Sequence, residues 1–220
     1  MSDAFKALLV ENVHPDADQA LQGSGPIEIE RRPGSPDRED LLKRVPDAHV
    51  LGIRSRTQAD AELIEAATNL VAIGCFCIGT NQVDLDAAAK RGVPVFNAPF
   101  GNTRSVAELT IASVIMLMRR IPEKMFAIDK GDWLKTAEGA YEVRKKKLGI
   151  VGYGNIGAQL SVIASALGMH VYYYDVEPKL VHGNARESET LEALLKECDA
   201  VTLHVPSTER TRGMIGREEI

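Results

Sequence analysis

Three glycines, Gly152, Gly154 and Gly157, follow an apolar run in the segment KLGIVGYGNIGAQL, and Asp175 ends the next apolar run, HVYYYD. The first glycine allows a tight turn, the second leaves room for a pyrophosphate beside the main chain, and the third lets a helix pack closely on a strand. A carboxylate in the position of Asp175 accepts hydrogen bonds from the hydroxyl groups of a ribose. These residue types and their spacing predict a dinucleotide site.

Main-chain N–H groups near Asn155 and Ile156 complete the predicted site. They lie at the expected start of a helix, where free N–H groups and the helix dipole attract phosphate. The charge of Asp175 repels the additional phosphate of NADP, and no arginine follows it directly to receive one. The sequence therefore favours NAD over NADP.

Glycines at this spacing also occur in ordinary turns, so the interpretation depends on the flanking elements. Residues 148–151 are typical of a buried strand, and residues 170–175 of a second one. Between them, apolar residues recur at helical spacing from Ile156 to Leu167, and Gly168 is a suitable end for a helix. Strand, glycine turn, helix and strand in this order favour a dinucleotide site over a plain turn.

Strand and helix patterns also alternate through the first hundred residues. We expect strands over residues 6–13, 27–30, 48–55, 70–77 and 93–98, and helices over residues 38–45, 59–69 and 84–92. Alternation of this kind predicts a parallel sheet that helices cover on both faces.

A long helical pattern follows from Ser105 to Lys130. Ser105 and Glu108 have the spacing of a capping box at its start. Pro122 is expected to kink or interrupt the helix, because proline cannot donate a main-chain hydrogen bond. We place a domain boundary just before this helix, near residue 103. The predicted fold class is therefore α/β, with two doubly wound parallel-sheet domains.

Composition narrows the class of protein. The chain has 220 residues, 45% of them hydrophobic, and its formal net charge of −5 argues against a nucleic-acid surface. No apolar run reaches the length of a membrane span, and no signal peptide is recognised at the N-terminus. Three cysteines, Cys75, Cys77 and Cys198, suit a reducing cytoplasm. We expect Cys75 and Cys77 to be buried packing residues, and we predict no metal site.

Longer stretches carry a resemblance to a known family. They are GIRSRT, LVAIGCFCIGTNQVDLDAAAKRGVPVFNAPFGNTRSVAEL, KKLGIVGYGNIGAQL, YYYD and TLHVP. Through them the chain resembles the D-isomer-specific 2-hydroxyacid dehydrogenase family from Ala7 to Ile220, and in particular its bacterial members that act on phosphoglycerate. The resemblance implies a flavodoxin-like substrate domain over residues 1–103 and a Rossmann NAD-binding domain over residues 104–220, which begins with a long dimerisation helix.

The resemblance also implies an activity. Its members of this kind oxidise 3-phosphoglycerate with NAD to 3-phosphohydroxypyruvate, the first step of L-serine biosynthesis, as cytoplasmic homodimers or homotetramers. Three alternatives stay open: a D-2-hydroxyacid dehydrogenase for another substrate such as glycerate or lactate, a non-catalytic NAD-sensing scaffold of the same fold, and a fragment that assembles with full-length subunits. The two arginines of the RSR segment favour a doubly charged substrate over lactate.

By the same resemblance, Arg54, Ser55, Arg56 and Asn102 face the substrate, and residues 77–80 line the cleft nearby. Guanidinium groups match carboxylate and phosphate groups with paired hydrogen bonds. The plainer interpretation is that both arginines are solvated loop charges.

Two further residues follow the long helix. The resemblance implies that Trp133 packs on a partner subunit, and that Lys135 adds positive charge to the substrate site of that partner. Alternatively, Trp133 is a surface residue that anchors its own helix.

The LHVP segment lines the adenosine side of the cofactor pocket in the family, which assigns His204, Val205 and Pro206 to cofactor binding. We therefore interpret His204 as a pocket residue without a catalytic role. The family's catalytic arginine, glutamate and histidine are expected beyond Ile220. We accordingly expect no catalytic residue within these 220 residues, a truncated second domain, and an inactive isolated chain.

Overall fold

The computed structural model describes residues 5–23 and 25–219. Its contacts divide the chain into two units, Met1–Gly101 and Asn102–Ile220, next to the boundary expected near residue 103. Within the described residues, no helix combines the length and the apolar character needed to cross a membrane.

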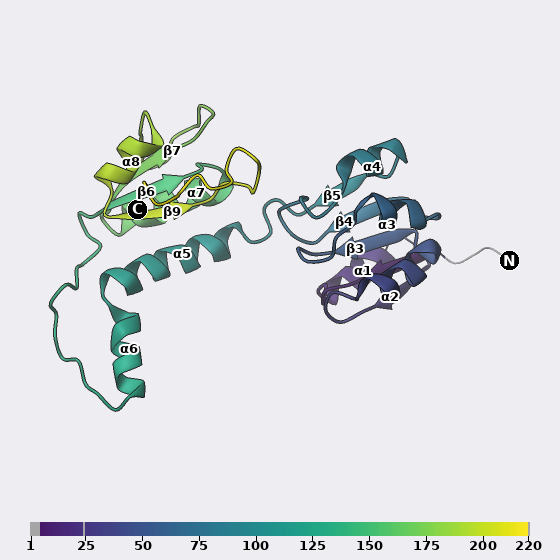
Figure 1. Cartoon of the computed structure of the whole chain (residues 1–220), viewed down its shortest axis with the longest axis horizontal. Helices are drawn as coiled ribbons and strands as arrows, with labels where there is room; N and C mark the ends of the chain where they lie inside the picture. The colour runs from purple at the N-terminus through teal and green to yellow at the C-terminus, as the bar shows by residue number, and fades with distance from the viewer. Residues whose placement is uncertain (1–4, 24, 220) are drawn as a thin grey trace. The chain divides into compact units, whose positions relative to one another are not determined.

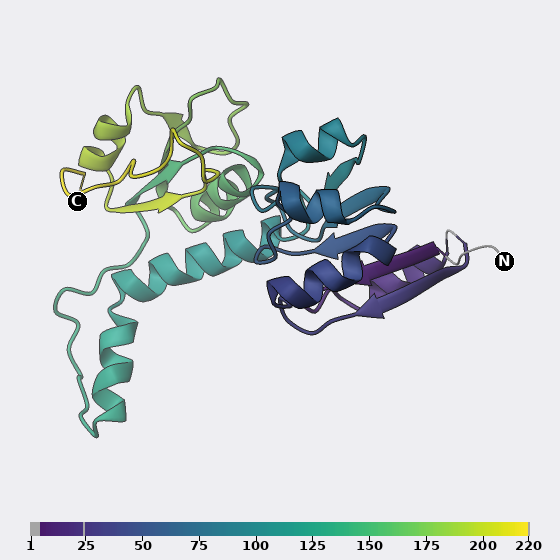
Figure 2. The same cartoon turned by 45° about the vertical axis from the view of Figure 1, so that its right-hand side comes forward.

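A five-stranded parallel sheet forms the first unit, in the order β2-β1-β3-β4-β5 (Figure 1). Its strands are β1 (Phe5–Leu9), β2 (Ile27–Arg31), β3 (Val50–Ile53), β4 (Ala72–Cys75) and β5 (Val95–Asn97). The helices are α1 (Asp16–Gln22), α2 (Arg38–Arg44), α3 (Ala61–Ala66) and α4 (Leu85–Lys90), with a short 3-10 helix η1 (Val45–Asp47). Figure 2 shows these helices along the sheet. This strand order is that of the flavodoxin-like fold. The sheet is extended to one side of β1 by β2 and to the other side by β3, β4 and β5, so the order reverses between β1 and β3.

Aspartates fix where three of these helices begin. Asp37, Asp60 and Asp84 each stand just before a helix and accept a hydrogen bond from the N–H three residues on, at 2.8–3.0 Å. Such caps satisfy N–H groups that have no partner inside the helix. The apolar faces then pack around Leu51, Ile53 and other fully buried residues of the central strands.

Two expectations for the first unit were inaccurate. The predicted strand over residues 6–13 ends at Leu9, because Glu11 and Asn12 have φ of 61° and 53° and turn the chain out of the sheet. Helix α1 was not predicted. It is short and has no fully buried residue, and its partly buried Ala17 and Leu21 pack against the core without giving a long apolar pattern.

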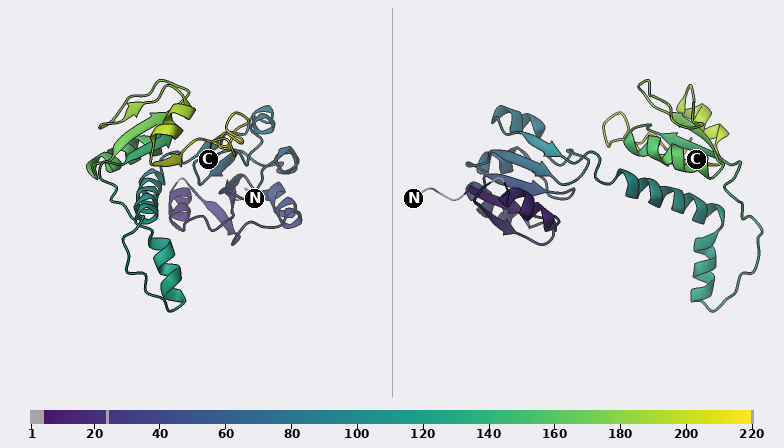
Figure 3. Two further views of the ribbon diagram at one scale, coloured as in Figure 1. Left: turned by 60° about the vertical axis from the view of Figure 1, so that its left-hand side comes forward. Right: turned by 180° about the vertical axis from the view of Figure 1, so that it is seen from behind.

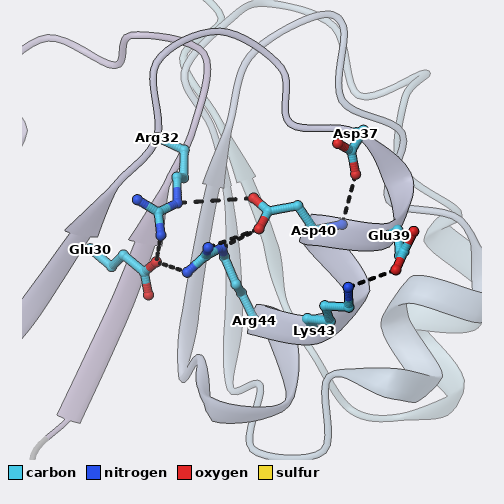
Figure 4. A network of polar contacts seen from close by, with 7 residues as sticks. All are labelled: Glu30, Arg32, Asp37, Glu39, Asp40, Lys43 and Arg44. Carbon is cyan, nitrogen blue, oxygen red and sulfur yellow. Dashed lines mark hydrogen bonds and ion pairs between the residues drawn. The ribbon is translucent and has the colours of Figure 1, made fainter.

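A ring of charges joins α2 to the edge strand β2 (Figure 4). Arg44 contacts Asp40 at 2.8 Å and Glu30 at 2.6 Å, while Arg32 contacts Glu30 at 2.9 Å and lies 4.0 Å from Asp40. All four side chains are partly exposed, so each pair contributes little alone. Together they fix α2 against the strand.

The second unit contains a four-stranded parallel sheet in the order β8-β7-β6-β9. Its strands are β6 (Lys147–Val151), β7 (His170–Tyr174), β8 (Arg186–Glu187) and β9 (Ala200–Leu203), and its helices are α5 (Thr103–Met118), α6 (Ile121–Asp129), α7 (Asn155–Ala166) and α8 (Leu191–Glu197). Counted within the unit, the third, second, first and fourth strands lie side by side, as in the first part of a Rossmann sheet. Two parallel sheets with helices confirm the predicted α/β class.

Helix α5 belongs to the core of the second unit. Its buried residues Ala107, Ile111 and Val114 share one apolar cluster with Leu160 and Ala164 of α7. The predicted capping box at its start was wrong. The helix begins at Thr103, and the Ser105 hydroxyl donates to the Asn102 carbonyl at 3.0 Å.

The predicted interruption near Pro122 is present. Helix α5 ends at Met118, Arg120 takes a left-handed conformation with φ of 55°, and α6 begins at Ile121. Proline has no N–H to donate to the Met118 carbonyl, which accepts instead from the Tyr141 N–H at 2.8 Å. We call residues 121–140 the arm. Its helix α6 has no buried residue and extends away from the sheet of its unit (Figure 3).

Candidate functional site

The glycine turn after β6 is closely packed at two of its three glycines. Gly152 has φ of +93°, and a Cβ there would lie 2.7 Å from the His204 carbonyl oxygen and 2.9 Å from a Val205 methyl group. A Cβ on Gly157 would collide with the Gly152 carbonyl oxygen and lie 3.0 Å from Ile150. These two glycines therefore allow β6, β9 and α7 to approach each other.

Gly154 differs, because a Cβ there would meet no atom within 4 Å. It occupies the capping position of α7, and no side chain among the described residues caps this helix. The first N–H groups of α7, at Asn155 and Ile156, lie in the turn that intrahelical bonds leave unsatisfied. An open space in front of such N–H groups suits an anion.

Asp175 lies beside this turn, at the carboxyl end of β7, with its side chain 11% exposed. One carboxylate oxygen accepts from the Tyr153 N–H at 2.7 Å, and the other from the Glu177 N–H at 3.0 Å. The Lys179 ammonium group is 3.6 Å away. Each oxygen has a second lone pair, so the carboxylate can still accept hydrogen bonds from a ligand.

One pocket of about 540 Å³ unites these features. Of the predicted cofactor residues, Gly152, Gly154, Asp175, His204, Val205 and Pro206 line it. Its volume falls within the range of small-molecule sites. Sequence reasoning missed several other lining residues, including Val176, Lys179, Leu191, Arg210, Thr211 and Met214.

His204 enters the pocket from the end of β9. Its main-chain N–H donates to the Val151 carbonyl at 2.7 Å, and its Nε2 lies 3.1 Å from the Thr202 hydroxyl. Burial lowers the pKa of His204 below its ordinary value, which favours the neutral imidazole. These contacts describe a histidine held within the pocket wall.

The segment Arg54, Ser55 and Arg56 follows β3 in the first unit, and all three residues are exposed. Its main chain rests on Glu11, whose carboxylate accepts from the N–H groups of Arg54, Arg56 and Thr57 at 3.1, 3.0 and 2.8 Å. Both guanidinium groups thus extend from a loop whose main chain is held by the Glu11 carboxylate.

Glu11 itself is buried, with 6% of its surface exposed. Burial alone raises the pKa of this carboxyl, but the hydrogen bonds from Thr57, Arg56 and Arg54 outweigh that effect, and the pKa of Glu11 is lowered overall. It is therefore ionised at neutral pH. Sequence reasoning missed this role, because Glu11 is distant along the chain from the loop it holds.

The other predicted substrate residues, Asn102 and Lys135, and the predicted interface residue Trp133 belong to the second unit. Asn102 precedes α5 and is exposed, and its carbonyl accepts from the Val106 N–H at 3.0 Å. Trp133 and Lys135 lie in the arm, where Trp133 is 76% exposed. Both line a surface hollow of about 390 Å³ together with Lys124 and Ile128.

The two neighbouring cysteines of the first unit pack against its core, but only Cys75 is buried as expected. Cys75 is buried in the core, where burial raises its pKa to about 11, and the partly buried Cys77 packs against the same cluster. The three cysteines are free thiols. Across residues 5–23 and 25–219, no group of histidine, cysteine, aspartate and glutamate side chains is arranged to hold a metal ion.

Comparison with known proteins identifies the family. Residues 7–216 match the model of the D-isomer specific 2-hydroxyacid dehydrogenase catalytic domain. The chain belongs to this family. It is 54% identical over 218 residues to the D-3-phosphoglycerate dehydrogenase of Escherichia coli K12, covering 99% of this chain and 53% of that protein. The chain thus spans about half the length of this curated relative.

Solved structures share the fold of this chain. The TT0316 protein of Thermus thermophilus superimposes with a TM-score of 0.87 at 33% identity, covering 98% of this chain and 69% of that one. An NAD⁺-bound 3-phosphoglycerate dehydrogenase of Entamoeba histolytica superimposes with a TM-score of 0.79 at 28% identity, covering 99% and 68%.

Proposed function

We propose that this family member takes part in the NAD-dependent oxidation of 3-phosphoglycerate to 3-phosphohydroxypyruvate, the first step of L-serine biosynthesis. The observation that carries the proposal is the pocket in which Gly154 leaves open space at the start of α7, with Asp175 beside it. The relative of 54% identity, which is named for phosphoglycerate, supports the choice of substrate.

The residues present fit NAD. Gly154 has room for a diphosphate that a Cβ would occupy, and the N–H groups of Asn155 and Ile156 are suited to bind it. Asp175 would hold the adenosine ribose, while His204, Val205 and Pro206 would cover the adenosine from the β9 side. When bound, NAD supplies the acceptor for the hydride that leaves C2 of the substrate.

The substrate carries a carboxylate and a phosphate, and the RSR segment offers two guanidinium groups for them. Other arginines of the first unit, such as Arg31, Arg38 and Arg44, are engaged in ion pairs. Within the described part of the chain, neither Arg54 nor Arg56 makes one. We assign both to substrate binding, with Ser55 between them, Asn102 as a polar contact, and Lys135 as a further cation.

We assign no proton transfer to His204. Its imidazole is paired with Thr202, and we assign it to the adenosine side of the cofactor pocket rather than to the reacting end. The chain's own residues bind and orient the two reactants.

We further propose that the protein works in the cytoplasm as a homodimer or homotetramer. Free thiols at all three cysteines suit a reducing compartment. The exposed Trp133 and its apolar neighbours in the arm offer a surface for a second copy of the chain.

A substrate panel tests the proposed function. Using the protein as its gene encodes it, NADH formation would be followed with 3-phosphoglycerate, glycerate and lactate. We expect the highest kcat/KM with 3-phosphoglycerate, and a much lower one with NADP in place of NAD. Faster turnover of lactate would contradict the choice of substrate. Binding of partner proteins that depends on NADH, without any turnover, would instead support a scaffold.

A further inference from the structure

In the first unit, the loops at the carboxyl ends of the five strands are joined to one another. The Glu11 carboxylate, after β1, binds the loop after β3. The Ser35 hydroxyl, after β2, lies 2.9 Å from the Thr57 hydroxyl. The Asn97 amide, at the end of β5, donates to the Ile78 carbonyl at 2.7 Å. Ligands of open α/β sheets bind at this edge, where the strand order reverses between β1 and β3.

Glu11 occupies that reversal point in an unusual conformation. Glu11 and Asn12 are consecutive non-glycine residues with positive φ, a combination that normally carries steric strain. The Glu11 N–H donates to the Gly34 carbonyl at 2.6 Å, which secures the turn from the β2 side. The strained turn brings the buried carboxylate beneath residues 54–57.

The N–H groups of Arg54, Arg56 and Thr57 converge on one carboxylate group. Main-chain N–H groups converge in the same way where loops bind anions. In this protein an internal carboxylate already fills that cradle. We propose that Glu11 is a positioning residue: by occupying the main-chain cradle, it fixes the loop so that an external anion is bound by the Arg54 and Arg56 guanidinium groups. This inference rests on the proposed function of the loop in substrate binding.

A second buried side chain, that of Gln82, also holds the loop. The Gln82 amide nitrogen donates to the Arg54 carbonyl at 2.8 Å and to the Gly79 carbonyl at 3.2 Å. It therefore ties the loop after β3 to the loop after β4. Glu11 accepts hydrogen bonds from main-chain N–H groups of the loop, and Gln82 donates one to a main-chain carbonyl. Both the donors and an acceptor of the loop's main chain are therefore held.

Substitution Glu11→Gln tests the role with little change of shape. One amide oxygen replaces two carboxylate oxygens, and the amide NH₂ opposes a main-chain N–H. Simple electrostatics predicts tighter binding of an anionic substrate, because a negative charge near two arginines is lost. Positioning predicts the opposite, so the sign of the effect separates the two explanations.

In the protein as encoded, we expect Glu11→Gln to raise the KM for 3-phosphoglycerate about tenfold, with kcat and the KM for NAD changed less than about threefold, the pattern of lost uniform binding. Glu11→Asp should lie between this variant and the wild type. Glu65→Gln, an exposed glutamate of α3, is the matched control and should leave all three constants unchanged. In an Arg56→Ala background, Glu11→Gln should add less than it does alone, because it acts through the same loop.

Hydrogen exchange gives a readout that does not need activity. We expect the amides of Arg54, Arg56 and Thr57 to be protected in the wild type and to exchange faster in Glu11→Gln. A KM that falls or stays constant in an active Glu11→Gln enzyme would overturn the positioning role, as would unchanged exchange at these amides. If the wild type turns over no phosphoglycerate, the proposed function fails, and the exchange experiment still judges whether Glu11 orders the loop.

Discussion

The carboxylate of Asp175 accepts a hydrogen bond from the main-chain N–H of Tyr153 at 2.7 Å, which ties the end of β7 to the glycine turn after β6. The same carboxylate therefore has a structural bond and, in our proposal, a bond to ribose. Substitutions at Asp175 and Glu177 that each remove one negative charge show whether NAD binding depends on hydrogen bonds of Asp175 or only on the charge of the pocket.

Asp175→Asn should weaken NAD binding and reduce the preference for NAD over NADP. Hydrogen bonds to a charged group contribute about 1.5–3 kcal/mol, so the Kd for NAD should rise roughly 10- to 100-fold. Calorimetric titration with each cofactor measures it. The control Glu177→Gln removes the same charge from an exposed side chain of the same pocket and should leave the Kd nearly constant. Equal effects of both variants would refute the ribose role.

Alanine substitutions at Gly152 and Gly154 should affect different properties, the first folding stability and the second cofactor binding. At Gly152 the positive φ and the nearby His204 carbonyl make alanine destabilising, by more than about 1 kcal/mol. At Gly154 the φ of −82° and the open surroundings accept a methyl group, so the free energy of unfolding should change by less than about 0.5 kcal/mol.

Gly154→Ala should weaken cofactor binding although it leaves stability nearly unchanged. Because the methyl group of Gly154→Ala would occupy the space in front of α7, the Kd for NAD should rise at least about tenfold in a fully folded variant. Urea unfolding and cofactor titration on the two variants measure both effects. A Gly154→Ala protein that binds NAD normally would show that the diphosphate does not lie there.

The partly buried His204 should make stability depend on pH. Its pKa is lowered in the folded state, so below about pH 6.5 the unfolded chain binds more protons than the folded one. The resulting loss of stability is absent above that pH and grows as the pH falls toward the folded-state pKa. His204→Gln should flatten the dependence of the urea midpoint between about pH 7.5 and 5. His170→Gln, an exposed position, serves as the control and should retain the wild-type slope.

Trp133→Ala should weaken self-association without destabilising the protomer. The indole is 76% exposed within one chain, and exposed side chains change the free energy of folding by less than about 0.5 kcal/mol. Light scattering during size-exclusion chromatography should show a smaller assembly or a higher dissociation constant. Phe100→Ala replaces an aromatic ring of similar exposure outside the arm and should not alter the mass. An unchanged mass together with an unchanged dissociation constant for Trp133→Ala would exclude the interface role.

Local periodicity made part of the fold predictable. Alternation of strand and helix patterns predicted both parallel sheets, and the missing N–H of Pro122 predicted an interruption of the long helix, which the structure places after Met118. The start of α5 was missed because Ser105 bonds back to Asn102 within the first turn, so the spacing of a capping box was present without its geometry.

The site was only partly predictable, for a related reason. Glycine spacing and an acid at a strand end identify the turn and Asp175, since each has a local sequence signature. Arg210, Thr211 and Met214 reach the same pocket from an irregular segment that has no such signature. Glu11 acts through contacts with residues more than forty positions away, and one sequence alone does not pair them.

The bond between the Met118 carbonyl and the Tyr141 N–H closes the base of the arm. Helix α5 therefore ends with its last turn satisfied, whatever lies between those two residues. Insertions or deletions within the arm would leave the packing of α5 on α7 intact. The arm is thus attached to the core at one closed point, and in our proposal a second copy of the chain can dock on it without disturbing that core.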